Sequence, residues 1–185
     1  MVGIGLLPGL EARLGSILLR FSPLHEPSRG GLGDSLVGVK HRLLNETKTT
    51  PALMYAVTLR LPTGDAARGL GEQGVDTALI AVGGKTLGPV KLTWNGGYTF
   101  VSRDRALDFW LLTGALEYRP TQTWALVGEC VSTLGVTKVP AEVVLRVGAV
   151  YPLSRRLKLD GALGWGVTRA SPDLLLTVGV TIALF

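Results

Sequence analysis

Hydrophobic and polar residues alternate with a period of two along most of the chain, which is the pattern of strands with one apolar and one polar face. After position 157, for example, Leu159 and Trp165 fall on one face, whereas Lys158 and Asp160 fall on the other. The same alternation runs through three more segments, 53–61, 91–101 and 141–151. No segment of useful length has the period of a helix, so we predict an all-β chain.

The alternating segments and the turn residues between them predict about 11 strands. Most of these strands have about 9–12 residues, the length that a tilted strand needs to cross a bilayer, whereas strands of globular proteins are usually shorter. We therefore predict an antiparallel transmembrane β-barrel. The predicted strands are 2–7, 10–20, 34–44, 51–62, 77–87, 90–101, 107–118, 124–134, 141–152, 157–168 and 174–185.

The connections between these strands tend to alternate in length, as the periplasmic turns and outer loops of transmembrane barrels do. If Phe185 ends on the periplasmic side, the turn at Pro8-Gly9 lies there too, and the first strand runs inward from outside. Because bacterial single-chain barrels have even strand numbers, we expect a twelfth strand before Met1. The segment from Met1 to Leu10 also lacks the basic region of a signal peptide. We thus expect residues 1–185 to be one barrel domain that is truncated at its N-terminus.

Composition is consistent with this prediction and excludes several function classes. Mean hydropathy is +0.34, with 46% hydrophobic and 18% charged residues, yet no apolar run reaches the roughly 18 residues of a spanning helix. A buried soluble core would give the same composition. The net charge of +5 comes from basic residues scattered among acids, so no nucleic-acid partner is expected. The single cysteine, Cys130, excludes an internal disulfide and a multi-cysteine metal site.

Aromatic residues cluster toward the strand ends of the apolar face, where the two interfaces of a bilayer would lie. In a soluble sandwich they would be ordinary core aromatics. The predicted girdle residues are Phe100, Trp110, Tyr118, Trp124, Tyr151 and Trp165.

Charged residues fall on the other face of the strands, which the barrel would turn toward its lumen. There they avoid about 2–4 kcal/mol that Arg or Lys costs when it faces lipid at the midplane. Two interpretations stay open: a polar channel lining or solute site, and a salt-bridged plug that fills a narrow barrel. Cross-strand pairs are expected, for instance between Glu142 and a base on a neighbouring strand. The predicted lumen-lining residues are Glu11, Arg13, Lys40, Arg42, Arg60, Lys91, Glu117, Glu129, Glu142, Arg146, Lys158 and Asp160.

Signatures of catalysis and of cofactor or metal binding are weak. His25 is placed in a loop, and His41 lies six residues from Ser35, about 20 Å along a strand, so these two cannot form a nucleophile–base pair. We expect no enzyme activity, no cofactor and no metal. The acidic residues between Asp65 and Asp76 are interpreted as a solvated loop rather than a cation site.

Four segments resemble the outer-membrane transporter family of the MetA-type phenol-degradation pathway. They are GLGDSLVGVKHRL from Gly31, PALMYAVTLRLPTG from Pro51, ALEYRPTQTWALVGE from Ala115 and RLKLDGALGWGVTRASPDLLLTVGV from Arg156. The resemblance implies an outer-membrane barrel in a Gram-negative-type bacterium that takes up small, in part aromatic, molecules. One departure is the end of the chain, where Phe185 is one residue out of step with the apolar set of the last strand.

Three hypotheses follow. The first is a barrel for passive passage of small molecules, with loops 22–33 and 63–76 gating its outer mouth. The second is a structural or surface-interaction barrel closed by its ion pairs, and the third is a soluble lipocalin-like or sandwich protein. The expected partners of the first two are the lipid bilayer and the outer-membrane assembly machinery, and the solute of the first is unknown.

Overall fold

A computed structural model describes residues 1–21, 29–121, 124–154 and 156–183 of the chain. These residues form eleven strands and two short 3-10 helices, so the predicted all-β fold is confirmed. The strands are β1 (Val2–Leu7), β2 (Leu10–Phe21), β3 (Arg29–Leu44), β4 (Ala52–Leu61), β5 (Asp76–Leu87), β6 (Val90–Phe100), β7 (Phe109–Tyr118), β8 (Ala125–Gly135), β9 (Glu142–Pro152), β10 (Leu157–Gly166) and β11 (Leu175–Ile182). The 3-10 helices are η1 (Ala66–Arg68) and η2 (Arg105–Leu107).

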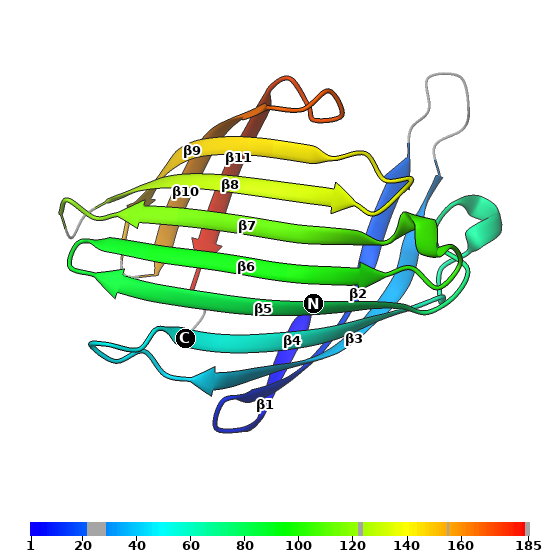
Figure 1. Cartoon of the computed structure of the whole chain (residues 1–185), viewed down its shortest axis with the longest axis horizontal. Helices are drawn as coiled ribbons and strands as arrows, with labels where there is room; N and C mark the ends of the chain where they lie inside the picture. Colours follow the sequence, from blue (N-terminus) through cyan, green and yellow to red (C-terminus); the bar gives the residue numbers. More distant parts are fainter. Residues whose placement is uncertain (22–28, 122–123, 155, 184–185) are drawn as a thin grey trace.

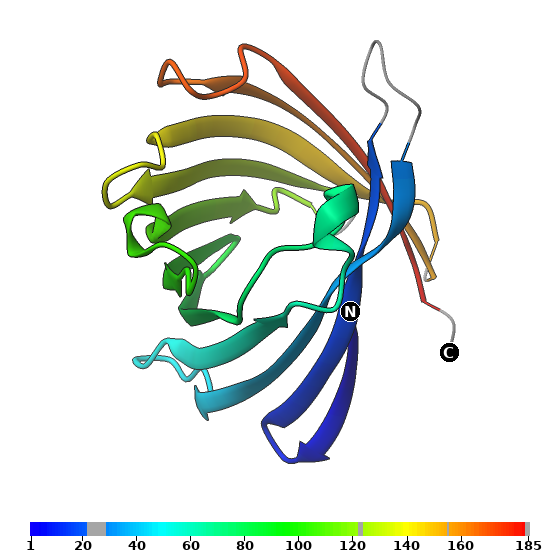
Figure 2. The same ribbon diagram turned by 90° about the vertical axis from the view of Figure 1, so that its right-hand side faces the viewer.

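All eleven strands belong to one antiparallel sheet in which each strand pairs with the next one along the chain. The sheet is strongly curled, so that one of its faces is concave and the other convex (Figures 1 and 2). Such a meander needs only local connections, and the period-two pattern of the sequence is enough to produce it.

The predicted closure of this sheet into a barrel is not part of the structure. The strand order ends with β1 at one edge and β11 at the other, and no pairing joins these two strands in the described part of the chain. The reason is topological: in a meander with an odd number of strands, the first and the last strand run in the same direction. They therefore cannot pair with each other in the antiparallel pattern of the rest of the sheet.

The two ends of the sheet differ in how the strands are connected. One end, here called the turn rim, carries the β1–β2, β3–β4, β5–β6, β7–β8 and β9–β10 connections. Two of them are two-residue turns in which Gly9 and Gly88 have positive φ, a conformation that favours glycine. The opposite end, the loop rim, carries longer connections such as 62–75 and 101–108 (Figure 2). The predicted alternation of connection lengths is thus present, most clearly in the first half.

Burial in this fold is the reverse of that in a soluble domain. Among the described residues, Leu70 and Ala125 are the only buried hydrophobic side chains, and they are 2% and 4% exposed. Large apolar side chains instead cover the convex face. In β7, exposed and half-buried residues alternate strictly, with Trp110, Leu112, Leu116 and Tyr118 outward. A chain with this sheet therefore has an extended apolar surface that water would not favour.

Strand boundaries match the prediction closely except at β3. We predicted a loop up to Gly33, but β3 begins at Arg29, because residues 29–32 pair with residues 18–21 of β2. Glycines and turn residues in this segment suggested a loop, and the long-range pairing with an apolar strand overrides that local preference. The remainder of the predicted loop, residues 22–28, lies outside the described residues.

Candidate functional site: the polar concave face

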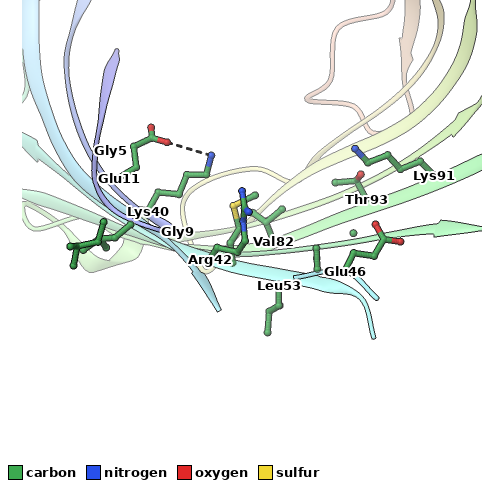
Figure 3. Close-up of a pocket in the computed structure, with 16 residues that line it drawn as sticks. Gly5, Gly9, Glu11, Lys40, Arg42, Glu46, Leu53, Val82, Lys91 and Thr93 are labelled. Carbon is green, nitrogen blue, oxygen red and sulfur yellow. Dashed lines mark ion pairs between the residues drawn. The ribbon is translucent and has the colours of Figure 1, made fainter. Parts of the chain in front are cut away.

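The charged residues predicted to line a lumen share the concave face of the sheet. The pairing register shows this directly, because Glu11 lies opposite Lys40 and Glu129 lies opposite Arg146 on neighbouring strands. Figure 3 shows Lys40 and Lys91 on this face, with Leu53 pointing the other way. The same parity places the other predicted residues there: Arg13, Arg42, Arg60, Glu117, Glu142, Lys158 and Asp160.

Only part of this charge is neutralised by ion pairs. Glu11 pairs with Arg13 Nε at 3.1 Å and more loosely with Lys40 Nζ at 4.0 Å. Arg146 donates to Glu129 at 2.8 Å. These side chains are about one third exposed, so each pair contributes little stability, within about 1 kcal/mol. Their effect is to place charges on the concave face at fixed positions.

The remaining charges of the set are not paired as we predicted. Glu142 has no ion-pair partner among the residues that the structure describes, because its neighbour across β8 is Thr133. Lys91 lies opposite Glu117, yet Glu117 binds Arg119 at the turn rim instead. The salt-bridged plug that we considered is therefore incomplete over the described ranges.

A cavity of about 410 Å³ lies on the concave face next to the turn rim (Figure 3). Its lining includes the basic residues Lys40, Arg42 and Lys91 and the apolar residues Met54 and Val82. Met54 is the cross-strand neighbour of Arg42, and Val82 is the neighbour of Met54. We call this cavity the basic pocket.

Glu46 stands at the edge of the basic pocket, and its charge is already satisfied. Its carboxylate accepts hydrogen bonds from Thr86 N at 2.6 Å and Thr86 Oγ1 at 3.1 Å, and Lys85 Nζ lies 3.8 Å away. The amide of Thr86, together with these two partners, holds the pKa of Glu46 below its usual value. Lys85 also donates to the carbonyls of Thr47 and Lys48. Lys85 could not be predicted from the sequence, because its position in β5 has the parity of the apolar face. Its contacts with the β3–β4 turn and with Glu46 account for a charged residue at this position.

At the loop rim, buried carboxylates fix the connections to the sheet. Asp34 is 2% exposed and accepts hydrogen bonds from Gly64 N at 3.1 Å and Glu72 N at 3.0 Å. Asp76 is 5% exposed and accepts from Ser102 N at 2.9 Å. Arg60 joins them, through a hydrogen bond to Asp76 and an Nε to Asp34 distance of 3.9 Å. Each carboxylate thus accepts hydrogen bonds from loop amides at part-buried sites, and these amides would lose their partners without it.

These contacts correct two of our expectations. Asp76 is a buried strand residue, and the interpretation of a solvated acidic segment from Asp65 to Asp76 is wrong at this end. Arg60 does lie on the concave face, but it binds two buried carboxylates instead of presenting a free charge. No polar pattern in the sequence indicates which distant amides a given aspartate will meet.

The β6–β7 connection is held by a third buried carboxylate, Asp108. Its oxygens accept from Val101 N at 2.7 Å, Tyr98 Oη at 2.9 Å and Arg105 Nε at 2.8 Å. Burial by itself would raise the pKa of Asp108, but these donors outweigh it and hold the pKa below the usual value. Asp108 therefore carries its charge in the folded protein down to acidic pH.

Five of the predicted girdle residues lie on the convex face, on the parity of the exposed apolar residues: Phe100, Trp110, Tyr118, Tyr151 and Trp165. The sixth, Trp124, precedes β8 and lines a small cavity with Ala125 and Lys158, so the pairing register does not assign it to that face. Tyr118, Trp124 and Tyr151 are close to the turn rim, whereas the others are toward the loop rim. Three further aromatics share the face, namely Tyr55, Trp94 and Tyr98. Trp94 is 43% exposed at mid-strand and packs over Gly83.

The remaining residues singled out in the sequence have simple surroundings. Ser35 Oγ shares a hydrogen bond with Thr63 Oγ1 at 2.8 Å, and the His41 ring packs edge-on against Tyr55 at 5.5 Å. Cys130 is exposed, whereas His25 lies outside the described residues. Within the described ranges, no group of three or more His, Cys, Asp or Glu side chains could hold a metal ion. Neither of the two described helices is long and apolar enough to cross a membrane.

The protein is thus an all-β protein built on one curled antiparallel sheet. The convex face of this sheet is apolar and the concave face carries the charged residues. The chain belongs to the family described as "Putative MetA-pathway of phenol degradation", whose model matches residues 2–184. The resemblance seen in the sequence motifs is thus confirmed over nearly the whole chain. A sequence search finds no match among curated proteins.

Proposed function

We propose that this protein is a transmembrane β-barrel of the outer membrane of a Gram-negative-type bacterium, and that small molecules, aromatic ones among them, pass through it passively. The observation that carries this proposal is the inverted burial of the sheet. Side chains such as Leu163, Trp165 and Val178 are 54%, 45% and 77% exposed on the convex face. In water this surface would cost free energy at about 25 cal/mol per Å², whereas hydrocarbon accepts it without that cost.

The concave face supports the passage of solutes. Charged and polar side chains on this face would replace part of the water around a solute, and they would select by charge without any coupling to energy. The motifs quoted above are those of a family linked to phenol degradation, which supports aromatic solutes. We propose no enzymatic role and no cofactor, and the expected partners are the lipid bilayer and the outer-membrane assembly machinery.

The proposal includes a twelfth strand that closes the barrel. The unpaired edges of β1 and β11 run in the same direction, so one strand antiparallel to both would satisfy the two edges together. Unpaired strand edges are not tolerated in hydrocarbon, which makes such closure a requirement of the membrane proposal. Twelve is also an even number, as expected for bacterial single-chain barrels.

A structural barrel whose interior is closed by ion pairs is the second candidate. The Glu129–Arg146 pair and the Glu11–Arg13–Lys40 cluster favour it, because both reach across neighbouring strands of the concave face. The two candidates differ in a single measurable property, the conductance of the folded protein.

The experiment is conductance in planar bilayers, with the protein, including the strand that closes its sheet, refolded from detergent and its heat-modifiable migration on gels verified beforehand. Passive passage predicts stable conductance steps and a change of ion selectivity in Glu129→Lys. The matched control is Arg169→Glu, an exposed loop residue, which should leave selectivity unchanged. A folded, membrane-inserted protein that is silent would contradict passage and favour the structural barrel. Full solubility without detergent would contradict both and favour a soluble β protein.

A further inference from the structure

We propose that the basic pocket binds a small organic anion with an apolar body, such as an aromatic carboxylate, through Arg42 and Lys91. This inference rests on the proposed function, because it names the charge class of the solute that the concave face would admit. It also assigns a definite place to that solute, on the concave face near the turn rim.

The two cations stand on opposite sides of the pocket. Arg42 rises from β3 and Lys91 from β6, with β4 and β5 between them (Figure 3). At the usual spacing of about 4.8 Å between strands, β3 and β6 are about 14 Å apart across the sheet. The β6 residue in line with Arg42 is Asn95, and Lys91 lies four residues beyond it, about 13 Å further along the strand. Both side chains are long and extend over the cavity, so the space between their charged ends suits a small molecule. The cavity volume of about 410 Å³ is within the range of ligand sites.

Arg42 and Lys91 are the cations of this pocket that form no close ion pair within the described residues, although the charge of Lys91 acts on Glu46 at longer range. Neither has an ion pair in the described part of the chain, and the only side-chain partner of Arg42 is Asn45 Oδ1 at 3.3 Å. By contrast, both carboxylates that line the pocket are engaged. Glu11 is bound by Arg13 and Lys40, and Glu46 is bound as described above. The uncompensated charge of the pocket is therefore positive, which favours an anion and disfavours a metal ion or an organic cation.

The floor between the two cations is apolar. It consists of Ala52, Met54 and Val82 on β4 and β5, with Gly84 beside them. A fully hydrated inorganic anion gains nothing from such a floor, whereas the ring of an aromatic carboxylate buries apolar area against it. The thioether of Met54 also makes favourable contacts with aromatic rings. Charge at the two sides and an apolar centre together point to an amphipathic organic anion.

The test is a fluorine NMR titration of the full chain, refolded in detergent, with 4-fluorobenzoate and with its neutral analogue 4-fluorobenzyl alcohol. Binding broadens and shifts the probe signal. The double variant Arg42→Gln, Lys91→Gln removes the cation on each side of the pocket, whichever of them the carboxylate meets, and should weaken 4-fluorobenzoate binding about fivefold or more. The matched control Lys158→Gln removes a charge from the same face outside the pocket and should leave the affinity unchanged. Circular dichroism verifies the strand content of each variant.

The expected result is that 4-fluorobenzoate binds more tightly than 4-fluorobenzyl alcohol, and that added salt and the double variant remove this difference. The charge-conserving pair Arg42→Lys, Lys91→Arg should retain most of the preference. Equal affinity for both probes, an equal loss in Lys158→Gln, or no binding by the folded chain would each overturn the inference.

Binding and conductance separate this inference from the proposed function. A protein that conducts but does not distinguish the two probes would keep the proposed function and lose the anion site. A protein that binds 4-fluorobenzoate at Arg42 and Lys91 but does not conduct would keep the anion site and lose the proposal of passage.

Discussion

The buried carboxylate of Asp34 offers the sharpest test of how the loop rim is held together. Its two oxygens accept hydrogen bonds from the backbone amides of Gly64 and Glu72, which lie near the two ends of the β4–β5 connection. In Asp34→Ala both amides lose their acceptor at a site where the carboxylate is 2% exposed. A buried donor without a partner costs about 1–3 kcal/mol, so we expect a loss of roughly 2–5 kcal/mol in the free energy of unfolding.

The control for this prediction is Asp65→Ala in the same connection. Asp65 is exposed, and its carboxylate accepts a single hydrogen bond among the described residues, from Arg68 N at 3.2 Å, at the start of η1. Removing such a cap costs about 1 kcal/mol or less in an exposed single turn. Equilibrium unfolding by urea in detergent measures both variants, and trypsin cleavage after Arg68 reports local opening of the connection. If the two variants lose the same stability and are cleaved at the same rate, Asp34 does not hold the connection.

Three further outcomes are expected. Arg60→Gln leaves two buried carboxylates without their guanidinium and should destabilise the protein by about 2–4 kcal/mol in the same urea assay, more than Lys158→Gln does. Gly83→Ala should displace the indole of Trp94, costing about 1–3 kcal/mol, and an unchanged tryptophan emission spectrum would refute the packing. Because the pKa of Asp108 is lowered by folding, its carboxylate contributes stability above about pH 4, and this contribution is lost as the pH falls further. Amide exchange near Asp108 should therefore rise below about pH 4 in the native protein but not in Asp108→Asn.

The strands and their two faces could be predicted from the sequence, because they depend on local alternation. Eleven strands were expected and the described part of the chain contains eleven, and residues such as Lys91 and Trp110 lie on the faces that parity assigns to them. A period of two determines which face a side chain takes regardless of what lies on neighbouring strands. The family resemblance rested on local motifs for the same reason.

Features that depend on contacts between distant segments could not be predicted. The role of Asp34 requires amides thirty and more residues away, and that of Lys85 requires carbonyls of the β3–β4 turn. The early start of β3 at Arg29 depends on its partner strand in the same way. The basic pocket combines the two cases. Alternation along the strands predicted that Arg42 and Lys91 share the concave face. That they flank the same apolar floor follows only from the pairing register of the strands between them.

The central claim is that lipid covers the convex face of the sheet. Depth-dependent fluorescence quenching tests it most directly, in variants that keep one tryptophan and are refolded into vesicles whose lipids carry bromine at different depths. Trp94 lies at mid-strand and Trp124 next to the turn rim, with exposures of 43% and 38%. The account predicts that deep bromines quench Trp94 most strongly and shallow bromines quench Trp124. Equal quenching of both at every depth, or none, would contradict it.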